Sequence, residues 1–243
     1  MRTSSRRVRP IAPLLMAALA GCSTAAPSAV GDGPTPPASL AAPTATAAPR
    51  TLPSRMAALE AGTYTLGSFP VPLTLVAPTG WDGFSGPTLA AVTNRLGTDS
   101  EAAVGFWIVD RVYEDPCSLR LADPPIGPGA GDLAAALDEM PSFTSEPATT
   151  APIAGLDAHY LEVNGPVGPT CDTYGLWRTA DDTCRCLSAG GERNRIWILE
   201  VGGVRVLVDA QDIPRSSENA GTSDDVLAEL ETIIASIDVT PAP

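Results

Sequence analysis

The sequence predicts an α+β domain over residues 61–240, with a mainly antiparallel sheet and helices packed against it, including a C-terminal helix. Three observations lead to this prediction. Short strand-like runs outnumber helical stretches, two of those runs flank Gly202 and Gly203, and an amphipathic stretch closes the region. Glycines supply the positive φ that a two-residue hairpin link needs. Hairpin-linked strands followed by a helix are typical of α+β domains.

The strands follow from alternating or continuously apolar runs. Most runs alternate and indicate half-buried strands, whereas residues 104–113 begin with an apolar stretch that suits a central strand covered on both faces. The predicted strands are residues 63–67, 73–77, 104–113, 158–164 and 173–178, and the hairpin of 195–201 with 204–210.

Two helices are predicted inside the domain, and a short one over 54–62 in front of it. The first begins at Asp132, taken as its cap, and ends before Pro141. The second covers residues 222–235, where Thr222 and Asp225 have the spacing of a capping box. Its apolar residues recur at helical spacing, so one broad face should pack on the sheet.

The first residues have the order of an export signal. Residues 1–10 carry four arginines and residues 11–20 carry no charge. The segment Leu19-Ala20-Gly21-Cys22 resembles the lipobox of bacterial lipoproteins. That resemblance implies that residues 1–21 are a signal peptide, that Cys22 carries acyl chains such as palmitate, and that the protein sits on the outer face of the cell membrane. An ordinary secretory signal is the alternative, and the general and twin-arginine export routes both stay open.

Residues 22–60 are predicted to be the lipidated Cys22 and a disordered tether. They are rich in Pro, Ala and Thr and contain no aromatic residue, so they cannot bury enough apolar surface to offset the entropy of ordering. Removing residues 1–21 leaves 11 arginines against 28 acidic residues, a net charge of −17. This charge repels nucleic-acid phosphates and anionic headgroups. We therefore expect no nucleic-acid partner and contact with the membrane through the lipid anchor.

The segments "FWIVDRVYEDPC", "CDTYGLW" and "RIWILEVGGVRVLVDA" together resemble a family of uncharacterised exported proteins from actinobacteria and Chloroflexi. In that family a "VYxDPC" motif follows a strand, and a second cysteine lies further on. The order of elements also resembles the PsbP-like fold of some mycobacterial lipoproteins, which implies an antiparallel sheet with helices packed against it. The resemblance supplies no catalytic residue.

Four cysteines remain beside Cys22. An even number outside the cytoplasm indicates disulfides. The family resemblance implies that Cys117 pairs with Cys171, which leaves Cys184 and Cys186; those two need a tight turn to bond, because alternate residues of a strand lie nearly 7 Å apart. Pairings of Cys117 with Cys184 or Cys186 stay open. A metal site of Cys184, Cys186 and His159 is the functional alternative, but no matched ligand spacing supports it, so we expect no metal and no cofactor.

His159 is the only histidine, and an imidazole-based enzyme would have to use it. Alternation puts it on the face of Leu161 and Val163, at or beside the core. No nucleophile elbow, phosphate loop or dinucleotide fingerprint is present in the sequence. The sequence thus favours a non-catalytic binding or accessory module of the cell envelope, with a protein, small-molecule or glycan ligand. A small envelope hydrolase using His159 or a carboxylate is the alternative.

Overall fold

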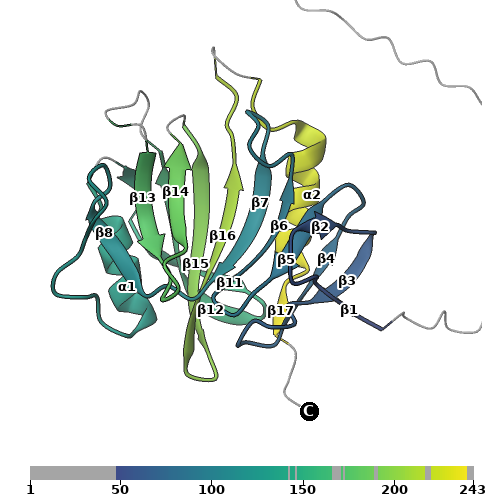
Figure 1. Ribbon diagram of the computed structural model, residues 1–243, viewed down its shortest axis with the longest axis horizontal. Helices are drawn as coiled ribbons and strands as arrows, with labels where there is room; N and C mark the ends of the chain where they lie inside the picture. The colour runs from purple at the N-terminus through teal and green to yellow at the C-terminus, as the bar shows by residue number, and fades with distance from the viewer. Residues whose placement is uncertain are drawn as a thin grey trace, which may run out of the picture. The chain divides into compact units, whose positions relative to one another are not determined.

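Figure 1 shows a computed structural model of the chain. The structure describes residues 48–141, 143–145, 147–165, 171, 173–188, 191–216 and 220–239. The chain divides into two units, residues 1–45 and residues 46–243, and all of the described residues belong to the second. Cys22 and most of the predicted tether lie outside the described residues.

A nine-stranded sheet, here called the main sheet, forms the centre of the second unit. All of its pairs are antiparallel. In spatial order its strands are β10 (Thr144–Ser145), β12 (Leu156–Asn164), β15 (Arg193–Val201), β16 (Val204–Asp212), β7 (Ala102–Trp107), β6 (Leu89–Asn94), β5 (Asp82–Ser85) and β2 (Ala57–Ala58), and β11 (Thr149–Ile153) also pairs with β12.

Two smaller sheets and two helices complete the described fold. One sheet has the order β1 (Arg50–Thr51), β3 (Gly62–Thr65), β4 (Leu73–Ala77) and β17 (Asp238–Val239), in which only β1 and β3 run parallel. The other, here called the side sheet, has the order β14 (Cys184–Ser188), β13 (Thr173–Arg178), β8 (Arg111–Asp115) and β9 (Arg120–Leu121). The helices are α1 (Ala130–Asp138) and α2 (Asp224–Ala235).

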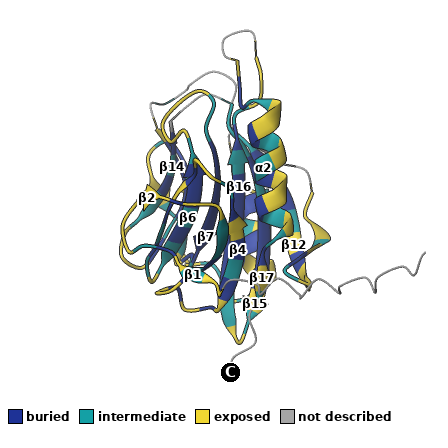
Figure 2. Cartoon of the chain, turned by 90° about the vertical axis from the view of Figure 1, so that its right-hand side faces the viewer, coloured by how far each residue is buried: buried dark blue, intermediate teal, exposed yellow. Residues whose placement is uncertain are grey.

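The two faces of the main sheet cover two separate cores, because successive side chains of a strand point to opposite faces. On β7, Phe106 belongs to the core under α2 and β4, whereas Trp107 belongs to the core under α1 and the side sheet. Val208 and Leu207 divide in the same way on β16. Figure 2 shows α2 with its outward side exposed. The result is mostly antiparallel sheet with two helices, one of them close to the C-terminus.

Several predicted elements have the expected place. The hairpin of β15 and β16 turns at Gly202 and Gly203, both with positive φ, and all six residues of β7 are buried, as a strand covered on both faces requires. The run predicted as one strand over 104–113 is broken, however. β7 ends at Trp107 in the main sheet, and β8 begins at Arg111 in the side sheet.

The helix predicted over 54–62 is wrong, and the fold begins earlier than residue 61. Residues 57–58 form strand β2 at the edge of the main sheet, and β1 pairs with β3. Leu52 and Leu59 are buried in the core under α2. Residues 50–60, which we assigned to the tether, therefore belong to the domain, because these two leucines bury apolar surface that the Pro-rich segment before them lacks.

Both helix starts also differ from the prediction. The first residue before α1 is Gly129, and Asp132 lies inside the helix, where its carboxylate accepts the Gly129 N–H at 2.9 Å. The cap of α2 is Ser223, whose hydroxyl accepts the Val226 N–H. Thr222 is buried instead and donates to the Glu101 carbonyl oxygen at 2.7 Å. It therefore ties the residue before α2 and its cap to the loop that precedes β7.

Candidate functional site

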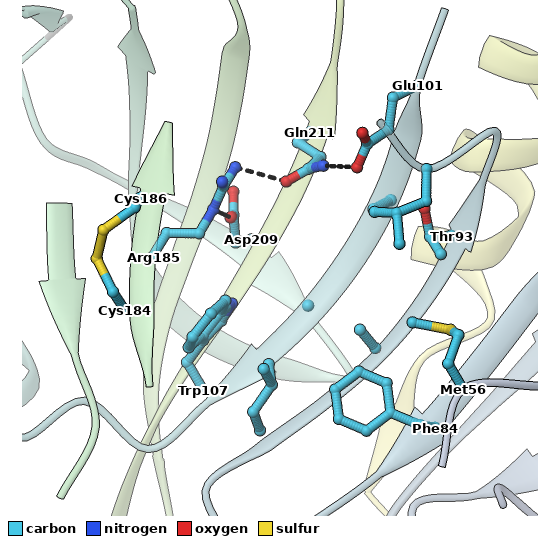
Figure 3. Close-up of a pocket in the computed structure, with 15 residues that line it drawn as sticks. Met56, Phe84, Thr93, Glu101, Trp107, Cys184, Arg185, Cys186, Asp209 and Gln211 are labelled. Atoms are coloured by element: carbon cyan, nitrogen blue, oxygen red, sulfur yellow. Dashed lines mark hydrogen bonds and ion pairs between the residues drawn. A yellow bond between two sulfur atoms is a disulfide. The ribbon is translucent and has the colours of Figure 1, made fainter. Parts of the chain in front are cut away.

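The main sheet is left open over part of the face that carries α1 and the side sheet. There a hollow of about 280 Å³, here called the sheet pocket, lies between the edge strand β14 and the strands β16, β7, β6 and β5 (Figure 3). Its lining combines an apolar end, a floor of small residues and a polar end. The lining residues are Met56, Phe84, Leu89, Ala91, Thr93, Leu96, Glu101, Ala103, Gly105, Trp107, Cys184, Arg185, Cys186, Asp209 and Gln211.

Strand register explains how the sheet pocket is built. One row across four neighbouring strands runs Phe84, Ala91, Gly105 and Asp209. Because strands lie about 4.8 Å apart, the Cα atoms at the two ends of this row are about 14 Å apart. The row is aromatic at β5, nearly free of side chain at β6 and β7, and acidic at β16. The hollow thus lies above Ala91 and Gly105.

Trp107 leans over the glycine of this row. A Cβ atom built at Gly105 would lie 2.6 Å from Trp107 Nε1, a distance that real Cβ contacts do not show. Only glycine at position 105 therefore lets the indole keep its place. The ring also stacks edge-on against Trp177, with centroids 5.7 Å apart, which anchors it to the side sheet.

A buried charge cluster forms the polar end. Arg185, the second residue of β14, donates from Nε to Asp209 Oδ2 at 2.8 Å and from Nη2 to Asn194 Oδ1 at 2.7 Å. Its Nη2 also contacts the carboxylate of Glu192 and the amide oxygen of Gln211. The single guanidinium thus joins strand β14 of the side sheet to strands β15 and β16 of the main sheet.

The pKa values of this cluster follow from burial and charge. Burial alone would lower the pKa of Arg185, but the Asp209 and Glu192 carboxylates raise it above its ordinary value. Burial raises the pKa of Asp209, and the neighbouring Arg185 offsets part of that increase. Asp209 is 2% exposed, so its charge depends on the guanidinium rather than on water.

Glu101 closes the polar end from the loop before β7. Its Oε1 accepts from Gln211 Nε2 at 2.6 Å, and its Oε2 accepts from the Gly97 N–H at 2.6 Å. Burial raises the pKa of Glu101, which the Gly97 hydrogen bond partly counteracts. Gln211 therefore links this carboxylate to Arg185, and the chain from Arg185 through Gln211 to Glu101 is visible in Figure 3.

Two buried polar atoms beside the sheet pocket have no hydrogen-bond partner among the residues that the structure describes. They are Trp107 Nε1, a donor, and Asp209 Oδ1, an acceptor. The residues that carry them are 6% and 2% exposed and both line the pocket. An unsatisfied buried polar group costs about 1–3 kcal/mol. Both atoms have almost no exposed surface, so a group from the pocket would bond to them, and recover that cost, only by displacing the side chains that cover them.

Four cysteines lie in two close pairs in the structure. Cys117 bonds Cys171, with Cα atoms 5.6 Å apart, and Cys184 bonds Cys186, with Cα atoms 5.3 Å apart. The second pair lies at the start of β14, directly after a turn in which Asp182 has a positive φ. It forms part of the wall of the sheet pocket.

His159 is exposed and does not line the sheet pocket. It stands on the predicted face of β12, but at the margin of the core, where its ring lies against the backbone of Gly131 in α1. It makes no hydrogen bond or ion pair with any residue that the structure describes. Within the described ranges, no three His, Cys, Asp or Glu side chains are grouped so that they could hold a metal ion.

Sequence reasoning missed most of the sheet pocket. Strands β5 and β6 were not predicted, because "DGFS" and "LAAVTN" are poor in the β-branched and aromatic residues that mark strands. One usable signal was present on β16. Asp209 and Gln211 follow Leu207 at alternate positions, so a polar pair occupies a face that begins apolar. Arg185 between two cysteines gave no comparable signal.

No known protein family model matches this chain, and no curated protein matches it. Among the described residues, no helix has the length and apolar character needed to cross a membrane.

Three solved structures show weak similarity. A protein from Bacteroides thetaiotaomicron VPI-5482 has 12% identity and a TM-score of 0.34. The match covers 69% of this chain and 45% of that protein. The cyanobacterial PsbP (CyanoP) of Synechocystis sp. PCC 6803 has 12% identity and a TM-score of 0.33, covering 83% of this chain and 99% of that one. LpqN of Mycobacterium tuberculosis, involved in cell envelope biogenesis, has 14% identity and a TM-score of 0.26, covering 77% and 91%. These scores do not establish a shared fold.

Proposed function

We propose that this chain is a lipid-anchored protein of the bacterial cell envelope whose domain binds a ligand in the sheet pocket without transforming it. The observation that carries the binding function is the pair of unpartnered buried atoms, one donor and one acceptor, on a hollow open to solvent. Seven buried side-chain atoms of the described residues have no hydrogen-bond partner, and these two are the ones carried by residues that line the pocket. Their position in one pocket supports a ligand as the missing partner.

The location rests on the sequence. The lipobox-like segment before Cys22 supports acylation, and the Pro-rich stretch after it supports a spacer between membrane and domain. The two cysteine pairs support an oxidising compartment, since disulfides persist outside the cytoplasm. In this proposal the chain is a member of the exported actinobacterial and chloroflexal family that it resembles, with a PsbP-like domain.

The arrangement of the polar end favours binding over the hydrolase alternative. His159 lies outside the pocket, so it is not placed to act on a pocket ligand. Asp209 is held by Arg185 and Glu101 by Gln211 and Gly97. Both carboxylates thus already serve as acceptors in fixed hydrogen bonds, which suits recognition more than proton transfer.

The binding function is tested with the full chain purified in detergent. The protein is incubated with a small-molecule extract of its own cell envelope, washed, and examined by native mass spectrometry. The Ala91→Leu variant places a larger side chain on the pocket floor, and Ala235→Leu, on the exposed side of α2, is the matched control. We expect a bound species on the wild type and on Ala235→Leu that Ala91→Leu lacks. Equal retention by all three proteins would contradict a ligand site in the sheet pocket.

The anchor is tested separately by metabolic labelling with an alkyne fatty acid. We expect label on the wild-type chain in the membrane fraction, and an unlabelled Cys22→Ser chain that leaves that fraction. A Cys22→Ser chain that keeps both the acyl label and the membrane location would overturn the anchor.

A further inference from the structure

The two unpartnered atoms of the sheet pocket are carried by residues on the same face of two neighbouring strands, β7 and β16. Trp107 Nε1 stands over Gly105, and Gly105 is the direct register partner of Asp209. Side chains directly opposite each other on one face of a sheet have Cβ atoms about 5 Å apart. Figure 3 shows the indole nitrogen on the side of the ring that faces Asp209. No hydrogen bond joins the two residues, and each of the two atoms has almost no exposed surface.

A group that satisfies both atoms must itself accept one hydrogen bond and donate another. A carboxamide does so with its carbonyl oxygen and its N–H, and a hydroxyl does so with one oxygen. An ammonium has no acceptor for the Trp107 N–H, and a carboxylate has no donor for Asp209 Oδ1. The pairing of a free donor with a free acceptor therefore indicates an uncharged head group.

The surrounding charges also disfavour an anion. Asp209, Glu192 and Glu101 surround the polar end, and the one cation among them, Arg185, is already shared by Asp209 and Glu192. A carboxylate head would meet these three acids and no free cation. An ammonium would meet a favourable charge, but it would leave the buried indole N–H unsatisfied, which costs about 1–3 kcal/mol.

The opposite end of the pocket fits an apolar tail. Phe84 closes the row that begins at Asp209, and Met56, with 42% of its surface exposed, also lines the pocket. Figure 3 shows Met56 beside Phe84. With about 30 Å³ per water-sized group, a hollow of about 280 Å³ takes roughly nine non-hydrogen atoms.

We propose that the sheet pocket binds an uncharged amphiphile, with a carboxamide or hydroxyl head between Trp107 Nε1 and Asp209 Oδ1 and a short apolar tail directed over Ala91 toward Phe84. This inference rests on the proposed binding function and adds the chemical class of the ligand. In this proposal Trp107 and Asp209 recognise the head group, and the apolar end of the pocket binds the tail.

The test compares three probes of similar size with the full chain: heptanamide, heptanoate and octylammonium. Affinities are measured by isothermal titration calorimetry on the wild type, Trp107→Phe, Ala91→Leu and the control Ala235→Leu. We expect heptanamide to bind the wild type and Ala235→Leu with a Kd of about 1 mM or below, and to bind at least about fivefold more tightly than either ion. Ala91→Leu should lose this binding.

Trp107→Phe keeps an aromatic ring but removes the N–H donor together with part of the indole. It should weaken heptanamide about tenfold more than it weakens octylammonium, because only the carboxamide bonds to the indole N–H. Circular dichroism of each variant checks that the fold is kept. Equal effects of Trp107→Phe on both probes would overturn the head-group assignment.

The remaining outcomes separate the inference from the function on which it rests. If octylammonium or heptanoate binds as tightly as heptanamide and Ala91→Leu abolishes it, the head-group assignment is overturned while the pocket stays a binding site. If no probe binds, or if Ala91→Leu leaves heptanamide binding unchanged, the ligand class is overturned. The envelope-extract experiment then decides alone whether the pocket binds anything.

Discussion

Replacing Arg185 with leucine would leave Asp209 buried without its ion-pair partner. The guanidinium is 10% exposed and the carboxylate 2% exposed, and Nε lies 2.8 Å from Oδ2. Water therefore screens the pair little, and removing one partner from such a pair costs about 3–5 kcal/mol. For a domain of this size 1 kcal/mol corresponds to about 2–4 °C in Tm, so the Tm of Arg185→Leu should fall by about 6–20 °C.

Urea unfolding followed by tryptophan fluorescence measures this cost, and a second substitution identifies its cause. In Arg185→Leu/Asp209→Leu the buried carboxylate is gone, so we expect the double variant to be more stable than Arg185→Leu alone. A loss below about 1 kcal/mol in Arg185→Leu, or a double variant less stable than the single one, would refute the view that a buried pair joins the two sheets here.

The pH dependence of the same variant has a definite sign. Without Arg185, Asp209 loses the charge that lowers its pKa, so burial raises the pKa further above its ordinary value. An acid whose pKa is raised by folding destabilises the fold above that pKa, and the destabilisation is relieved as the pH falls through it. The cost of Arg185→Leu should therefore be smaller near pH 5 than near pH 7.5.

Three further changes test other parts of the structure. Burial penalises only the charged form of Glu101, so Glu101→Gln should gain stability relative to the wild type as the pH rises from the ordinary Glu range through the raised pKa of Glu101. Urea midpoints across that range measure the gain, with exposed Glu139→Gln as the control. A stability difference between Glu101→Gln and the wild type that does not change with pH would contradict this prediction. Replacing Cys117 and Cys171 with serine should cost about 4 kcal/mol in the chain-entropy model, because that disulfide joins residues with a sequence separation of 54. Replacing Cys184 and Cys186, with a sequence separation of 2, should cost about 1.5 kcal/mol. Equal losses of stability in chemical denaturation would count against loop closure as the cause. Gly105→Ala should displace the Trp107 indole and cost about 1–3 kcal/mol of stability, because the new Cβ would lie 2.6 Å from Nε1. An unchanged Tm and an unchanged near-ultraviolet circular dichroism spectrum would show that the position of the ring does not depend on glycine.

The sequence predicts the elements whose pattern is local. The hairpin at Gly202 and Gly203, the fully buried β7 and the amphipathic α2 each have a signal within a dozen residues, and each is present. Leu52 and Leu59 were assigned to the tether because the composition around them is that of a linker. Their burial depends on strands distant in the sequence, which local composition does not reveal.

The sheet pocket is the part that the sequence conceals most. It arises where Ala91 and Gly105 are neighbours across two strands and Arg185 reaches from another sheet to Asp209. Small residues in a strand read as weak strand signals, not as the floor of a hollow. The position of the Trp107 indole over Gly105 depends on the direction of the side chain, which the spacing of residues in the sequence does not reveal.

The central claim, that the sheet pocket is a ligand site, is tested most directly by the indole N–H signals of the tryptophans. Nitrogen-15 labelled full-length chain is titrated with heptanamide, and Trp107→Phe identifies the signal of Trp107. We predict that this signal shifts in a saturable way, because its N–H gains a partner. The Trp81 signal should stay in place, since its N–H already donates to Glu229 Oε2 at 2.8 Å and Trp81 lies in the other core. A titration in which the Trp107 signal does not move, or in which both signals move alike, would contradict the claim.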